Sequence, residues 1–177
     1  SLNFVGFFVY VLSAPVFLMN HLGVSETSFL WLFGPAMGGL MLGSWLAGRF
    51  AGRRSPGATV KLGYAVMAAA ALINVVLNLI LPPSLPWSVL PLFLYTLGMS
   101  LAMPNLTLFA LDPFPDNRGM AASCQTFMQS GFNSVVAAAV APAVWGSTLS
   151  LALAMAGFLV LGSLAALLYL RSILLPG

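Results

Sequence analysis

The chain has 177 residues, of which 60% are hydrophobic and 5% are charged, and its formal net charge is +3. Soluble domains carry about 25% charged residues, so this chain lacks the polar side chains to cover a surface in water, and lipid is its expected solvent. Its six cations are too scattered to form the basic face that nucleic-acid binding needs, and its one cysteine, Cys124, cannot build a disulfide framework.

Apolar runs of membrane-spanning length recur along the chain, since a helix needs about 20 residues to cross a hydrocarbon core about 30 Å thick. These runs do not alternate polar and apolar residues as the strands of membrane barrels do. We therefore predict an all-α membrane protein with six transmembrane helices, near residues 2–19, 27–48, 59–81, 88–110, 120–145 and 149–170.

Short polar or proline-rich segments separate the predicted helices. Ser25 or Thr27 can cap the second helix, and three prolines within residues 82–87 end the third. If the helices alternate in direction, the segments at 49–58 and 111–119 lie on one side of the membrane, together with the C-terminal end. That side receives all the cations, namely Arg49, Arg53, Arg54, Lys61, Arg118 and Arg171. The positive-inside rule makes it the cytoplasm, so both chain ends are expected to be cytoplasmic.

Chemically reactive side chains are sparse in this sequence. One histidine, His21, one cysteine and three separated acids cannot form a metal site or a catalytic triad by local spacing, so we do not expect an enzyme. The acids Glu26, Asp112 and Asp116 all lie in predicted loops. Because proton coupling in transporters uses carboxylates or histidines inside the membrane, a coupling group is expected outside this chain.

The segment GSWLAGRFAGRR, residues 43–54, places glycines and arginines between the predicted second and third helices. It resembles the loop signature of the major facilitator superfamily, which joins the second and third helices of each six-helix half. The matching positions are Gly43, Arg49, Gly52, Arg53 and Arg54. Gly48 stands where the family often has Asp.

Two further stretches, residues 10–29 and 103–129, resemble segments of the drug:proton antiporters of the Bcr/CflA type. The resemblance implies one six-helix bundle over residues 1–177, forming the C-terminal half (helices seven to twelve) of a twelve-helix transporter. It further implies an N-terminal six-helix half as partner and a small amphipathic drug-like substrate bound between the halves. The proton gradient would drive efflux without a cofactor, by alternating access in a bacterial inner membrane. A sugar or metabolite carrier of the same superfamily and a non-transporting membrane scaffold or assembly subunit are the alternatives.

Polar and aromatic side chains inside the predicted helices mark candidate substrate contacts. Gln125, Gln129 and Asn133 are spaced four residues apart and share one face of the fifth helix, which lines the cavity in the family pattern. An amide stripe is unfavourable against lipid, so it is expected to face protein or a wet cavity, and substrate contact and helix–helix hydrogen bonding both stay open. The predicted substrate-binding residues are Tyr10, Ser13, Tyr95, Met99, Gln125, Gln129, Phe132 and Asn133. For Tyr10 and for the stripe that includes Tyr95 and Met99, ordinary packing is the alternative.

Small residues and prolines predict close helix approaches and bends. Gly34, Gly38, Gly39 and Gly43 form overlapping small-xxx-small patterns. By the family resemblance, this ridge faces the other half and is a candidate sliding surface. The residues predicted to serve gating or helix packing are Pro15, Gly34, Gly38, Gly39 and Pro104. Asn74 and Asn78 share a face of the third helix and are expected to make packing contacts.

Overall fold

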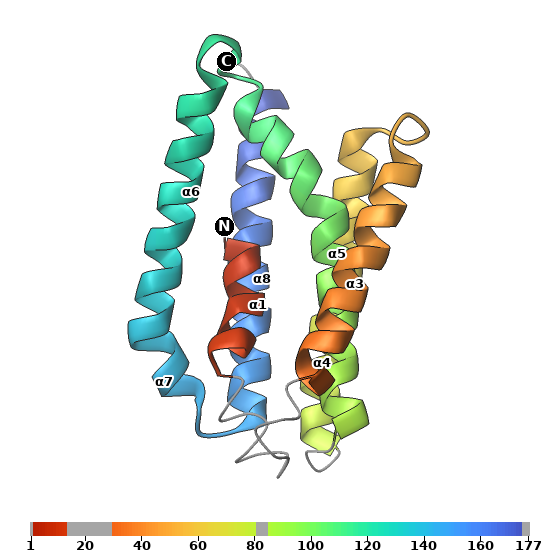
Figure 1. Cartoon of the computed structure of the whole chain (residues 1–177), viewed down its shortest axis with the longest axis vertical. Coiled ribbons are helices and arrows are strands. Elements are labelled where there is room, and N and C mark those ends of the chain that lie inside the picture. The colour runs from red at the N-terminus through yellow and green to blue at the C-terminus, as the bar shows by residue number, and fades with distance from the viewer. Residues whose placement is uncertain (1, 14–29, 81–84, 175–177) are drawn as a thin grey trace.

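A computed structural model describes residues 2–13, 30–80 and 85–174 (Figure 1). These residues are helical apart from short connections and include no strand. The helices are α1 (Leu2–Leu12), α3 (Leu30–Phe50), α4 (Pro56–Ile80), α5 (Leu85–Leu111), α6 (Arg118–Val135), α7 (Ala141–Val144) and α8 (Thr148–Leu174). A short 3-10 helix, Pro115–Asn117, precedes α6, and a π-helical segment, Val136–Val140, joins α6 to α7. The all-helical bundle expected from the sequence is confirmed.

Four segments of the described chain are long and apolar enough to cross a membrane, by length and composition. They are Pro56–Ile80, Val89–Leu111, Pro115–Val144 and Thr148–Tyr169. In addition, α3 has 21 residues, and α1 contributes 11 residues to the bundle, which are mostly apolar and include the polar Asn3. The expected first helix extends to residue 19, and its last residues, together with Pro15, His21, Ser25, Glu26 and Thr27, lie outside the described residues.

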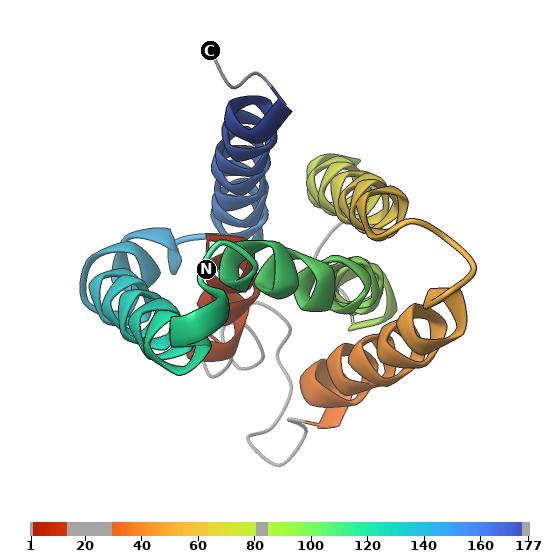
Figure 2. The same ribbon diagram turned by 90° about the horizontal axis from the view of Figure 1, so that it is seen from above.

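Helix α5 forms the centre of one side of the bundle, with α3 and α4 packed against it (Figure 2). On the α4 side, the two backbones touch at a pair of glycines. A Cβ atom added to Gly98 would lie 2.7 Å from the carbonyl oxygen of Gly63, and one added to Gly63 would lie 2.6 Å from that of Gly98. No side chain fits at either position, so this pair sets the distance between α4 and α5.

On the α3 side, glycines again allow the approach to α5. A Cβ atom on Gly39 would collide with the hydroxyl of Thr96, and one on Gly43 with the hydroxyl of Ser100. Both hydroxyls bond to carbonyls of their own helix, so they pack against glycine without an unmet polar group. Gly39 and Gly43 therefore face α5 of the same bundle, which fits the helix packing expected for Gly39, and a sliding surface toward another half stays a prediction. Gly34 and Gly38 are half-exposed.

The helix expected over residues 120–145 changes type along its length, from α6 through the π-helical segment to α7. In the π-helical segment, the N–H of Ala141 donates to the carbonyl oxygen of Val136, five residues back. The next residue, Pro142, has no N–H to donate, and its ring requires space that the wider turn provides. The sequence interpretation missed this local change in helix type.

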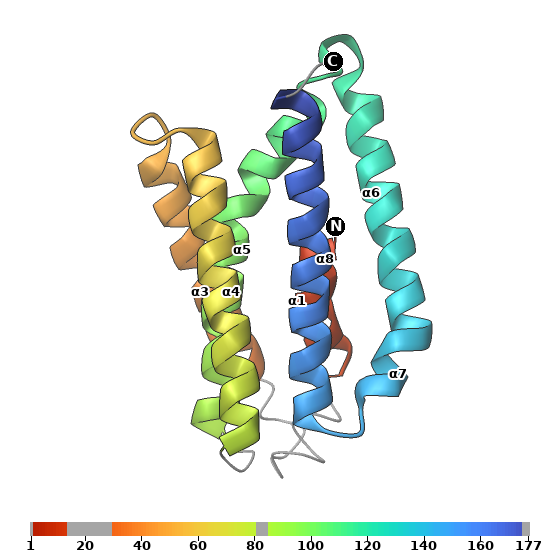
Figure 3. The ribbon, with the colours of Figure 1, turned by 180° about the vertical axis from the view of Figure 1, so that it is seen from behind.

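One end of the bundle carries the described cations, and we call it the basic end. Figures 1 and 3 show the α3–α4 turn, the α5–α6 link and the last turns of α8 at this end. Arg49 and Arg54 lie over the rings of Trp45 and Phe50, at 4.9 and 5.2 Å from the ring centres. The segregation of charge expected from the sequence is therefore present among the described residues.

Candidate functional site

A cavity of about 330 Å³ lies between α1, α4, α5, α6 and α8. Most of its wall is apolar, and no charged side chain lines it among the described residues. Its polar side chains come from four helices and are Asn3, Tyr64, Thr107 and Gln125. Apolar walls with a few converging polar groups are typical of small-molecule sites, so we take this interior cavity as the candidate functional site.

Asn3 connects the helices around the cavity. Its amide nitrogen donates to the hydroxyl of Tyr64 over 2.6 Å, and its backbone carbonyl accepts from the hydroxyl of Tyr95 over 3.0 Å. The hydroxyl of Tyr64 in turn donates to the carbonyl of Gly162 at 3.4 Å. One residue near the start of α1 is thereby bonded to α4 through its side chain and to α5 through its backbone carbonyl, and through Tyr64 it reaches α8.

The side-chain oxygen of Asn3 is buried, and no hydrogen-bond partner for it exists among the described residues. It lies against Gly162, where a Cβ atom would collide with it. A buried acceptor without a donor is costly, and such groups are rare in native structures. This oxygen is therefore a candidate contact for a bound molecule or for water.

Helix α6 contributes Gln125 and Phe132 to the cavity wall. The amide nitrogen of Gln125 lies 3.5 Å from the hydroxyl oxygen of Thr107, a long contact between α6 and α5. A second space, of about 440 Å³, shares Gln125, Phe132 and Ala110 with the cavity and extends along α6 past Cys124. The two spaces meet at these shared residues.

The amide stripe of α6 lies where the sequence predicted. Gln125, Gln129 and Asn133 occupy its half-buried face, whereas Phe127, Met128 and Val135 are exposed. The side-chain oxygen of Asn133 is buried and has no partner in the described part of the chain. Of the eight predicted substrate-binding residues, Gln125 and Phe132 line the cavity, and Gln129 and Asn133 share the face on which Gln125 lies.

The other four predicted residues lie in the packing core and do not line this cavity. Tyr10 and Tyr95 are 1% and 0% exposed, and Ser13 and Met99 are buried as well. Polar contacts account for three of them: Asn74 donates to Tyr10, Trp145 donates to Ser13 over 3.0 Å, and Tyr95 donates to Asn3. Packing, the alternative given for Tyr10 and Tyr95, describes their surroundings, and a role in substrate binding stays a prediction.

Sequence reasoning missed Asn3, Tyr64 and Thr107 as cavity residues. Each is a polar side chain in an apolar run, which is the available signal for such a site. Tyr64 belongs to the third predicted helix, whose polar side chains were expected to make packing contacts. Its hydroxyl reaches inward between α1 and α8, which only the packing of the three helices reveals.

Comparison with known protein families identifies the kind of protein to which this bundle belongs. The family model described as Major Facilitator Superfamily matches residues 1–140. The chain belongs to the major facilitator superfamily. Members of this superfamily are membrane transporters and not enzymes, so the chain is a multi-pass protein of a lipid bilayer. No curated protein and no solved structure was found to match the chain.

The loop that carries the major facilitator signature lies at the basic end. Its three arginines, Arg49, Arg53 and Arg54, are exposed, and Gly52 adopts a φ of +78°, a conformation that favours glycine. The hydroxyl oxygen of Ser55 then accepts from the N–H of Ala58 at 3.3 Å and caps α4. Glycine is therefore favoured at position 52 because the turn between α3 and α4 needs a backbone conformation that other residues rarely adopt.

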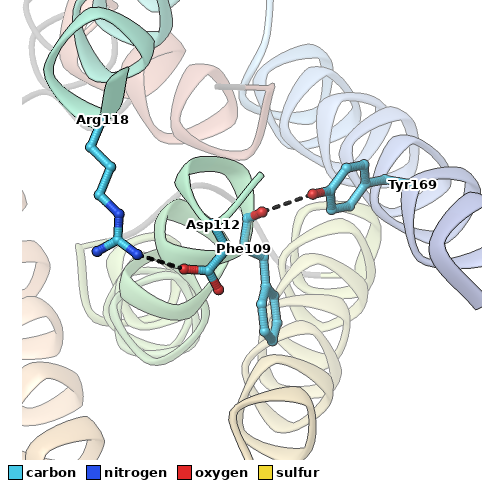
Figure 4. Close-up of polar contacts among 4 residues, drawn as sticks. All are labelled: Phe109, Asp112, Arg118 and Tyr169. Atoms are coloured by element: carbon cyan, nitrogen blue, oxygen red, sulfur yellow. Dashed lines mark hydrogen bonds and ion pairs between the residues drawn. The ribbon is translucent and has the colours of Figure 1, made fainter. Parts of the chain in front are cut away.

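Two contacts fasten the α5–α6 link at the same end (Figure 4). Arg118 pairs with Asp112 at 3.5 Å, and no second ion pair occurs among the described residues. The hydroxyl of Tyr169 on α8 donates to the carbonyl oxygen of Phe109 over 2.7 Å. The helical partner of that carbonyl would be residue 113, a proline without an N–H, so Tyr169 supplies the missing donor.

Proposed function

We propose that the chain is the C-terminal six-helix half of a proton-coupled multidrug exporter that works by alternating access. The single observation that carries this proposal is the uncharged cavity of about 330 Å³, with apolar walls and a few amide and hydroxyl groups. Such a surface suits the apolar body of a small amphipathic drug-like molecule and offers it a few hydrogen bonds. An N-terminal half would complete the site from the opposite side, near the middle of the membrane.

Proton coupling is assigned to a group outside this bundle. The described acids, Asp112 and Asp116, are exposed in the α5–α6 link and do not line the cavity. A coupling carboxylate belongs at membrane depth, next to the substrate path. We therefore place it in the N-terminal half.

The proposed surroundings are a bacterial inner membrane, with the basic end of the bundle in the cytoplasm. In a Cys124→Ser background, Ala51→Cys adds one exposed thiol in the α3–α4 turn, next to Gly52. An impermeant maleimide should label this thiol in inside-out vesicles and not in intact spheroplasts. Labelling of intact spheroplasts would reverse the proposed orientation.

Efflux by the complete natural protein tests the function. Cells that express it should extrude ethidium, and an uncoupler that collapses the proton gradient should stop the extrusion. Gln125→Leu should lower efflux about tenfold, equivalent to losing one hydrogen bond of about 1.4 kcal/mol. Ser130→Ala, on the exposed face of the same helix, is the matched control and should keep the wild-type rate. Equal rates for both variants, or efflux that persists without a proton gradient, would contradict the proposal.

A sugar or metabolite carrier of the same superfamily is the second candidate. The buried acceptor oxygens of Asn3 and Asn133, which have no donor among the described residues, favour a ligand with several hydroxyl groups. Saturable uptake of radiolabelled hexose by proteoliposomes, without ethidium efflux, would select this candidate. If a correctly folded protein shows neither activity, the remaining candidate is a non-transporting membrane scaffold or assembly subunit.

A further inference from the structure

A second binding surface lies between α4 and α8 and shares Tyr64 with the cavity described above. These two helices are neighbours on one face of the bundle, as Figures 2 and 3 show. Between them is a groove of about 200 Å³, lined by Val60, Lys61, Tyr64, Ser163, Ala166 and Leu167. We call it the α4–α8 groove. Because Lys61 and Leu167 are exposed, the groove faces the surroundings of the bundle, which for a membrane transporter is lipid.

Among the residues whose side chains the structure describes, Lys61 is the single charged one that lines this groove. No carboxylate partner exists for it in the described part of the chain, where Arg118 and Asp112 form the ion pair. The walls around it are almost entirely apolar. Ser163 offers no free hydroxyl proton, since its side chain donates to the carbonyl of Leu159 over 2.8 Å. The groove thus combines one unpaired positive charge with a surface suited to hydrocarbon.

Lys61 lies close enough to the start of α4 for its side chain to reach the lipid headgroups. Helix α4 has 25 residues and a length of about 37 Å at 1.5 Å per residue, which exceeds a hydrocarbon core of about 30 Å. Lys61 is five residues from the start of α4, or about 7.5 Å along its axis. Its ammonium group can therefore reach the boundary between hydrocarbon and headgroups at the basic end.

We propose that the α4–α8 groove binds one anionic phospholipid, with the phosphate at Lys61 and an acyl chain along Val60, Ala166 and the ring of Tyr64. A lipid phosphate supplies the negative charge that Lys61 lacks among the described residues, and an acyl chain matches the apolar wall beside it. A free inorganic anion could pair with Lys61 but would make no contact with the apolar wall of the groove. Basic positions between transmembrane helices are typical binding sites for anionic headgroups. The site does not depend on which substrate the transporter carries.

Native mass spectrometry of the complete natural protein tests this site. The purified protein is mixed with equal amounts of phosphatidylglycerol and phosphatidylcholine, and the retained lipids are counted. Wild type should retain one phosphatidylglycerol in preference to phosphatidylcholine. Lys61→Gln should lower that preference about fivefold, the effect of one lysine at an anionic surface. Arg54→Gln removes the same charge at the same end but outside the groove, and it should leave the preference unchanged.

A second variant tests the acyl-chain contact. Ala166→Phe fills the groove and should abolish retention of the lipid, and Ala166→Leu replaces it if the larger side chain prevents folding. Thermal unfolding in detergent checks that each variant is folded. Equal effects of Lys61→Gln and Arg54→Gln, or full lipid retention after the groove is filled, would overturn the proposal. Displacement of the lipid by inorganic phosphate alone would also overturn it, because it would show a simple anion site.

Discussion

The amide nitrogen of Asn74 donates a hydrogen bond of 2.7 Å to the hydroxyl of Tyr10 and so joins α4 to α1. Both side chains are fully buried. Asn78 extends the contact by donating to the side-chain oxygen of Asn74 over 3.0 Å. The aromatic residue predicted for substrate and the amide predicted for packing are thus the two sides of one contact.

Tyr10→Phe should lower the free energy of unfolding by about 0.5–1.5 kcal/mol, because the buried amide of Asn74 loses its acceptor. Unfolding in a mixed detergent titrated with dodecyl sulfate measures the change. Asn74→Leu should cost a similar amount, and the double variant should cost less than the sum, which is the mark of a direct interaction. If the folded Tyr10→Phe protein instead loses transport without losing stability, Tyr10 contacts the substrate.

Gly98→Ala should destabilise the bundle by about 1–3 kcal/mol, because overpacking at a close contact forces the backbones apart. The added methyl group would lie 2.7 Å from the carbonyl oxygen of Gly63, a backbone atom that cannot rotate away. Gly131→Ala is the control, since open space surrounds that glycine on the exposed face of α6. Thermal unfolding should separate the two variants, and equal midpoints would show that the α4–α5 contact tolerates a side chain.

Asn133→Leu should raise stability by about 1 kcal/mol while lowering transport, since it removes a buried acceptor that has no donor among the described residues. Asn74→Leu provides the contrast, because that amide is bonded and its loss should destabilise the protein. The two substitutions are chemically identical and should have effects of opposite sign. A loss of stability at Asn133 would mean that its amide has a structural partner.

Tyr169→Phe should cost about 0.5–1.5 kcal/mol of stability, because the carbonyl of Phe109 loses its donor and Pro113 cannot replace it.

Asp112→Asn should cost less than about 1 kcal/mol, since its ion pair with Arg118 is 3.5 Å long and both side chains are more than half exposed, at 59% and 58%. Unfolding measured at low and high salt checks the order. High salt should reduce only the effect of Asp112→Asn. A larger stability loss for Asp112→Asn than for Tyr169→Phe would show that the ion pair, not the hydrogen bond, stabilises the α5–α6 link.

Features that depend on local composition were predictable from the sequence. The described cations lie at one end because successive helices run in opposite directions, which the order of loops along the sequence already implies. Gln125, Gln129 and Asn133 share the half-buried face of α6 because residues four apart lie on one side of a helix. The proline-rich link also ends α5 at Leu111, within one residue of the predicted end. In each case a short stretch of chain contains the whole physical cause.

Features that depend on two helices at once were not predictable in this way. Nothing near Gly63 or Gly98 distinguishes them from other glycines, and only the crossing of α4 with α5 gives them a role. A tyrosine in the middle of an apolar helix suits a pocket or a buried hydrogen bond equally well, and Tyr10 has the latter because Asn74 lies opposite. Asn3 was overlooked for the same reason, since its partners are 61 and 92 residues away along the chain.

The glycine contacts on α5 have a mechanical consequence. At Gly63 and Gly98 the backbones of α4 and α5 lie against each other, so the spacing of these two helices cannot shrink there without a shift of the backbone itself. In contrast, α6 meets α5 through side chains such as Gln125 and Thr107, and the π-helical segment Val136–Val140 follows its last residue. We therefore expect a change in the shape of the cavity to come from a shift of α6, while α3, α4 and α5 keep their spacing.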